Sequence, residues 1–193
     1  PSTGDRACGA AVQYNGLRYQ NRRRFAPSPH STSFRSELEG AYETQCISDE
    51  VQPETELSHV VDNSSTVNAI NKPLWNAQQM LRPEADIILA LQKKRKSSPQ
   101  PPKVSWVRAH QDRDTKLEHL PLRSRFNCEM DRLAEDARTN AHPRPITPYA
   151  GSGAMLRICG HYVTTHYKMQ IRDAILRAPH QDYTIHKFNG WTP

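Results

Sequence analysis

Two short β-prone runs constrain the fold most, because each is apolar and each ends next to a polar group. Residues 57–61 (LSHVV) are followed by Asp62, and residues 104–108 (VSWVR) are closely followed by His110. Runs of this length and composition predict buried strands. A third strand is expected over residues 7–14 (ACGAAVQY), before a turn at Asn15-Gly16. We interpret Arg22, Arg23 and Arg24, which precede Pro27-Ser28-Pro29, as a basic loop.

Helical patterns separate these strands. We expect a helix over residues 34–46 capped by Ser33, a second over residues 64–70, and a third over residues 83–96 that begins at Pro83. The stretch up to residue 125 has no regular pattern, and a fourth helix is expected over residues 127–140. Strands that alternate with helices predict an α/β fold.

The composition restricts the class of protein. The chain has 193 residues, 36% of them hydrophobic, and a net charge of +6, which suits one domain with a small appendage and favours polyanionic partners. It has no apolar run long enough for a membrane helix. Four widely spaced cysteines without a CxxC pair predict a reducing, intracellular environment, cytoplasm or nucleus.

The composition also suggests where the domain ends. Residues 143–148 are rich in proline, which indicates a linker between a domain over residues 1–142 and a segment over residues 149–193. That segment is expected to form a small α+β appendage, with strands near residues 155–158 and 162–165 and a helix over residues 168–177. Its role does not follow from its residues.

Three carboxylates occupy comparable positions in these elements. Glu37 lies near the start of a helix, Asp62 follows a strand, and Asp131 lies in a later helix. Ends of strands and starts of helices converge at one edge of an open α/β sheet, and a carboxylate cluster there could bind Mg²⁺. Each acid alone has an ordinary alternative explanation, such as a turn residue, a helix cap or a partner of the helix dipole.

The order and context of these residues favour a site. RSELEG around Glu37, VVDNSS around Asp62, WVRAHQ around His110 and the N-x-x-x-D-x-L-A pattern of residues 127–134 together resemble the ribonuclease H family. The resemblance covers residues 7–140 and is strongest to the ribonuclease H domains fused to reverse transcriptases in retrotransposons. It implies a ribonuclease H-like mixed sheet flanked by helices.

The resemblance also implies roles. Glu37, Asp62 and Asp131 would be catalytic carboxylates that bind two Mg²⁺ ions, with Mn²⁺ as an alternative. His110 would assist proton transfer from a mobile loop, and Asn127 would support the site. Asp112 and Asp114 have no counterpart in the family pattern, and we interpret them as loop residues.

One family feature is missing from the sequence. The family's first carboxylate lies in an opening strand, typically in a D-G-S motif, and this chain has no such motif. Asp5 is preceded by too few residues to lie in that strand, and STGDR fits a hairpin turn better. We therefore expect the opening strand, and with it one metal ligand, to lie upstream of residue 1, and the chain alone to be unstable or inactive.

Two basic runs are candidates for contact with nucleic acid. The first is Arg22, Arg23 and Arg24, and the second is Lys93, Lys94, Arg95 and Lys96. Both could bind phosphates irrespective of sequence, while the second could equally complement the dipole at the end of its helix. Trp75 could add a stacking surface.

Three functions remain open. The resemblance implies an endonuclease that cuts the RNA strand of RNA–DNA hybrids, next to a reverse transcriptase domain in the same polyprotein. A catalytically dead module that binds nucleic acid is the alternative. An integrase or transposase of the same fold is disfavoured, because the loop from Trp106 to His110 and the helix with Asn127 and Asp131 fit ribonuclease H better.

Overall fold

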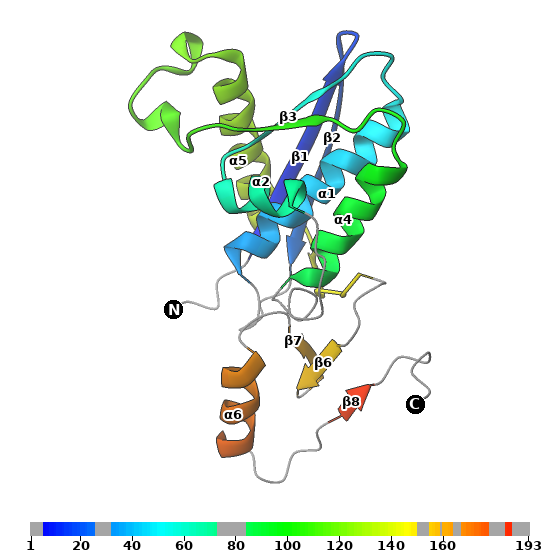
Figure 1. The fold of residues 1–193 in the computed structure, drawn as a ribbon. Helices are drawn as coiled ribbons and strands as arrows, with labels where there is room; N and C mark the ends of the chain where they lie inside the picture. The colour runs from blue at the N-terminus through cyan, green and yellow to red at the C-terminus, as the bar shows by residue number, and fades with distance from the viewer. Residues whose placement is uncertain are drawn as a thin grey trace.

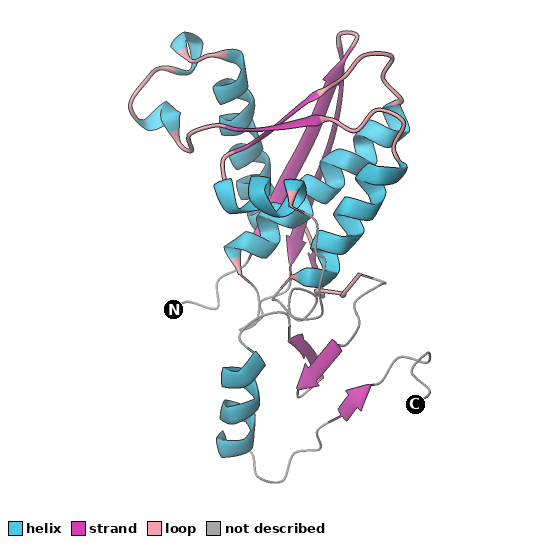
Figure 2. Ribbon diagram, in the orientation of Figure 1, coloured by secondary structure: helices cyan, strands magenta, loops and turns pink. Residues whose placement is uncertain are grey.

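The computed structural model of the chain describes residues 6–25, 32–72, 84–149, 155–158, 160–163, 167–177 and 184–186. Helices and strands alternate in a mixed α/β arrangement, as the sequence predicted (Figures 1 and 2). The strands are β1 (Arg6–Tyr14), β2 (Leu17–Phe25), β3 (Ser58–Val61), β4 (Lys103–Trp106), β5 (Pro143–Arg144), β6 (Met155–Ile158), β7 (His161–Val163) and β8 (Thr184–His186). The helices are α1 (Ser33–Val51), α2 (Ser64–Asn71), α4 (Ala85–Ser97), α5 (Leu122–Asn140) and α6 (Tyr167–Arg177), with short 3-10 turns at Gln111–Arg113 and Leu117–His119.

β1 and β2 form an antiparallel hairpin whose register runs from Arg6 opposite Phe25 to Tyr14 opposite Leu17. The turn is at Asn15-Gly16, as predicted, with φ of 49° and 75°, which are the positive values that a tight hairpin turn requires. The basic loop predicted for Arg22, Arg23 and Arg24 is wrong, since these residues lie in β2. Most of β2 is exposed, so it lacks the apolar alternation that would have marked it as a strand.

β1 is packed between two helices. On one face, Ala10 and Val12 contact Ile47 of α1. On the other face, α5 approaches so closely that a Cβ built on Gly9 would lie 2.8 Å from the Leu133 Cβ and 2.8 Å from the Met130 carbonyl oxygen. The small residues of β1 therefore allow α1 and α5, which carry three of the candidate site residues, to lie against the same strand.

β3 and β4 form a parallel pair in which Ser58 lies opposite Lys103 and Val61 opposite Trp106. Both strands were predicted, with ends displaced by one or two residues. In the described residues this pair shares no backbone hydrogen bond with the sheet formed by β1, β2 and β5. α1, α2 and α4 pack around the parallel pair, and α1 and α4 lie side by side (Figure 1). The core residues of these helices are Leu38, Ala41, Ile70, Ile87, Ile88 and Leu91.

Two helices are longer than their patterns predicted. α1 begins at Ser33, and its N-cap is Thr32, whose side chain accepts a hydrogen bond from the Arg35 backbone N–H. α5 begins at Leu122, inside the stretch expected to be irregular. The start of α1 was predicted within one residue, although the cap is Thr32 and not Ser33, and the helix continues past the predicted end at residue 46 to Val51. The start of α5 was not located, because a polar first turn carries little apolar periodicity. Asp5, Trp75 and Pro83 lie outside the described residues.

The C-terminal residues form a separate small sheet in the order β7-β6-β8, accompanied by α6. β6, β7 and α6 were predicted within one or two residues, whereas β8 was not. Within the predicted linker, Pro143 and Arg144 pair in parallel with Arg24 and Phe25 of β2. No helix in the described part of the chain is both long and apolar enough to span a membrane.

The contact at Gly9 gives a test of this packing. Gly9→Ala should destabilise the protein by about 1–3 kcal/mol, the usual cost of overpacking, because its Cβ would meet both Leu133 and the Met130 carbonyl. Urea unfolding measures the change. Gly16→Asn is the matched control, since open space surrounds Gly16 and Asn tolerates positive φ. Equal stability of Gly9→Ala and wild type would contradict the packing of α5 on β1.

Candidate active site

Four of the predicted site residues line one cavity of about 80 Å³. Glu37 comes from α1, Asp62 follows β3, and Asn127 and Asp131 lie one turn apart on α5. Residues of β1 and β3 complete its wall. The structure therefore brings together carboxylates that are far apart in the sequence.

Two side chains hold Asp62 by hydrogen bonds, and the residue after it caps a helix. Its carboxylate Oδ2 accepts a hydrogen bond of 3.2 Å from the Asn127 side-chain amide. Its backbone carbonyl accepts one of 2.9 Å from the indole N–H of Trp106. The next residue, Asn63, caps α2 by accepting a bond of 3.1 Å from the Thr66 backbone N–H. Since both sides of Asp62 are fixed, its carboxylate has a defined direction into the cavity.

Asp131 is paired with His110, whose Nδ1 lies 3.2 Å from the Asp131 Oδ2. His110 adopts a left-handed backbone conformation, with φ of 50°, which is uncommon for a residue other than glycine and often marks functional positions. The side-chain amide of Gln111 holds the loop by donating to the Arg108 carbonyl and to the Ser124 hydroxyl of α5. The imidazole is half exposed and lies at the rim of the site.

The carboxylates repel one another. Burial, with the charges of Asp62 and Asp131, raises the pKa of Glu37 from 4.5 to about 7. Burial and the charge of Asp62 also raise the pKa of Asp131, while His110 opposes this shift. The site thus concentrates negative charge that a proton or a cation would stabilise.

The donor atoms suit a hard cation, because Mg²⁺ prefers carboxylate oxygens. Their spacing is looser than a coordination shell: within the described ranges, no three His, Cys, Asp or Glu side chains are placed to hold one ion. The residues therefore fit the metal in chemistry and charge, and the described set does not by itself enclose it.

Asp112 and Trp106 interact with the site carboxylates, which the sequence did not predict. Asp112 lies close enough to Asp131 to add to the rise in its pKa, after burial and Asp62, although we interpreted it as a loop residue. Asp114 does match the loop interpretation, since it is exposed and its carboxylate lies 3.5 Å from Arg108. The bond from Trp106 to Asp62 follows from the pairing of β3 with β4, and the WVRAHQ pattern alone does not predict it.

The two basic runs lie away from this cavity. Arg22 pairs with Asp136 and Arg23 with Glu43, while Arg24 donates to the Ala141 carbonyl. These three arginines therefore connect β2 to α5 and α1.

The second run lies at the C-terminal end of α4, and the chain continues from there into the first residue of β4. His110 comes after the last residue of β4. Within the second run, Lys94 pairs with Asp49 at 3.0 Å and Arg95 donates to the Pro102 carbonyl. Lys93 and Lys96 are exposed. The run accordingly lies at the opposite edge of the sheet from the acids.

No protein-family model matches the chain, and no curated protein matches it either.

Glu37 gives a test of the electrostatics. A carboxyl whose folded pKa is raised makes the free energy of unfolding fall as pH rises from its unfolded pKa to its folded pKa, here from 4.5 to about 7. Glu37→Gln removes this loss. In metal-free buffer the variant should therefore exceed wild type in stability by about 1–3 kcal/mol at pH 8, and by much less at pH 4.5. Urea unfolding at both pH values, with Glu50→Gln as an exposed control on α1, checks this. If the difference in free energy of unfolding between Glu37→Gln and wild type did not change with pH, the raised pKa of Glu37 would be refuted.

Proposed function

We propose that this chain is part of a ribonuclease H-type endonuclease of a retrotransposon polyprotein, which cuts the RNA strand of RNA–DNA hybrids with Mg²⁺ or Mn²⁺. The single observation that carries the proposal is that Glu37, Asp62 and Asp131 line one cavity together with Asn127. These are the residues that the family pattern assigned to the site.

Each side chain has a role in this proposal. Glu37, Asp62 and Asp131 would hold the metal, which supplies an activated water and stabilises the leaving oxygen when bound. Asn127 orients Asp62 by donating to its carboxylate. Asp131 orients the His110 imidazole, which lies at the rim and would act there as the proton-transfer group.

Two cavities between β1 and β3 are the observation in favour of a ribonuclease H-like sheet. The first residues of β1 and the last of β3 line the site cavity, while the later residues of β1 and the first of β3 line a second cavity of about 250 Å³. The two strands thus run in opposite directions along one gap. A central strand between them, as in that family, would join the two sheets and could supply a further carboxylate.

Contacts with the substrate would come from duplex geometry and from exposed basic side chains. Recognition would rest on duplex shape and 2′-hydroxyl groups. Of the two basic runs, Lys93 and Lys96 are exposed for phosphate contact, while the arginines of β2 are engaged with protein groups. The resemblance implies a reverse transcriptase domain as covalent partner, and the widely spaced cysteines favour an intracellular location.

A cleavage assay tests the function. A labelled RNA–DNA hybrid is incubated with Mg²⁺ and either this chain or a version extended upstream by roughly one or two strands of typical length. We expect the extended version to cut, this chain to cut little or not at all, and Asp62→Asn in the extended version to abolish cutting because Asp62 is a metal ligand. Asp114→Asn, which changes an exposed acid paired with Arg108, should cut like the parent. Undiminished cutting by Asp62→Asn would refute the assignment of the site.

A second candidate is a non-catalytic module that binds nucleic acid. The observation in its favour is the absence, from the described part of the chain, of three metal-binding side chains grouped around one point. Hybrid binding without cleavage by the extended version would favour this candidate over the nuclease.

A further inference from the structure

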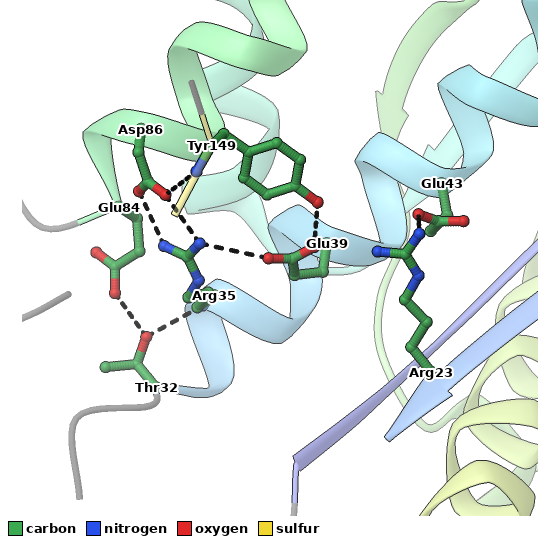
Figure 3. A network of polar contacts seen from close by, with 8 residues as sticks. All are labelled: Arg23, Thr32, Arg35, Glu39, Glu43, Glu84, Asp86 and Tyr149. Atoms are coloured by element: carbon green, nitrogen blue, oxygen red, sulfur yellow. Dashed lines mark hydrogen bonds and ion pairs between the residues drawn. The ribbon is translucent and has the colours of Figure 1, made fainter. Parts of the chain in front are cut away.

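A buried polar network joins α1 to α4 (Figure 3). At its centre is Arg35, which is 1% exposed. The guanidinium makes two hydrogen bonds of 2.9 Å to Asp86 of α4 and lies 3.5 Å from Glu39. Thr32 extends the network by donating to Glu84 at 2.7 Å. These contacts fix the first turns of α1.

Tyr149 joins this network through three different contacts. Its backbone N–H donates to Asp86 at 3.0 Å, and its phenol donates to the Glu39 Oε2 at 2.6 Å. Its ring packs on Tyr42 with the centroids 4.7 Å apart. Tyr149, which follows α5 in the sequence, is therefore bound to the beginning of α4 and to the first half of α1.

The segment that ends in Tyr149 is attached at two places. Pro143 and Arg144 pair with β2, and Tyr149 binds the network. Between these points, a cavity of about 490 Å³ is lined by the segment, by Arg23 and by Glu39. In the middle of the segment Ile146 lies near Phe25 and Glu39, and at its far end Tyr149 is bound to Asp86 and Glu39.

Helix α1 carries residues of both the polar network and the carboxylate site. Arg35 and Glu39 are four residues apart and share one face of α1. Glu37 lies between them and projects from the other side, since residues two apart differ by about 200° around a helix. Any rotation or fraying of these turns that follows loss of the network would displace the Glu37 carboxylate from the cavity.

The position of Glu39 depends on its hydrogen bond with the Tyr149 phenol. Glu39 is 4% exposed. Its carboxylate accepts a hydrogen bond of 2.6 Å from the Tyr149 phenol, whereas the Arg35 guanidinium lies farther away, at 3.5 Å. A buried carboxylate that loses its donor must find another. The nearest candidate is Arg35, whose movement toward Glu39 would weaken its pairing with Asp86.

We propose that Tyr149 is a positioning residue for the site: by binding Glu39 and Asp86, it couples residues 143–149, which follow α5, to the turns of α1 that carry Glu37. Because α5 carries Asn127 and Asp131, the coupling joins both helices of the site. The catalytic part of this inference rests on the proposed function, whereas the coupling itself does not.

Tyr149→Phe tests the inference, because it removes the hydroxyl and keeps the ring and the backbone N–H. We expect faster amide exchange in α1 at Glu37 and Leu38, and roughly tenfold weaker Mn²⁺ binding in calorimetry, about the effect of one hydrogen bond to a charged group. In the extended, active version kcat should fall while KM for the hybrid stays unchanged. Tyr149→Ala should give a larger effect in the same direction. Tyr162→Phe, in β7, is the control and should match wild type.

The outcomes separate the two proposals. Unchanged amide exchange at Glu37 in Tyr149→Phe would overturn the coupling, whether or not the protein cuts hybrids. If wild type neither binds Mn²⁺ nor cuts, the proposed function fails, and amide exchange still decides the coupling. Equal exchange and affinity changes in Tyr162→Phe would show a general loss of stability and would also overturn the inference.

Discussion

The pairing of Arg35 with Asp86 is the interaction on which much of this structure depends. Both side chains are buried, and a buried charge is tolerated only when its partner and hydrogen bonds are in place. The ion pair fixes the beginning of α1 against the beginning of α4. Glu39 and Tyr149 extend it to the segment after α5. Removing one member would leave a buried charge without its partner, which makes this region intolerant of change.

The carboxylates on the two sides of α1 have different partners. On the network side, burial disfavours the ionised form of Asp86, but hydrogen bonds and charge from Arg35, together with backbone N–H donors, lower its pKa overall. Burial raises the pKa of Glu39, although Tyr149 and Arg35 oppose this shift. On the site side, Glu37 faces Asp62 and Asp131, and burial together with their charges raises its pKa to about 7. This uncompensated charge is costly, and a fold retains such a cluster most readily where a cation binds.

Much of the fold could be predicted because its signals are local. The strand at residues 57–61 and the turn at Asn15-Gly16 follow from apolar runs and turn chemistry, and Asp62 was a candidate because it ends such a run. Features that depend on distant partners could not be predicted. The arginines of β2 pair with α1 and α5, Asp112 affects Asp131 only in the folded chain, and Tyr149 lies next to a stretch whose composition indicates a linker.

Paramagnetic broadening by Mn²⁺ tests the central claim, a metal site formed by three carboxylates, most directly. Substoichiometric Mn²⁺ is added to isotope-labelled protein, and the side-chain carboxyl signals are followed by NMR. We expect the signals of Glu37, Asp62 and Asp131 to broaden first and together, and those of exposed acids such as Glu50 and Asp114 to broaden only at higher concentration. Broadening that spares the three, or that begins at the exposed acids, would contradict it.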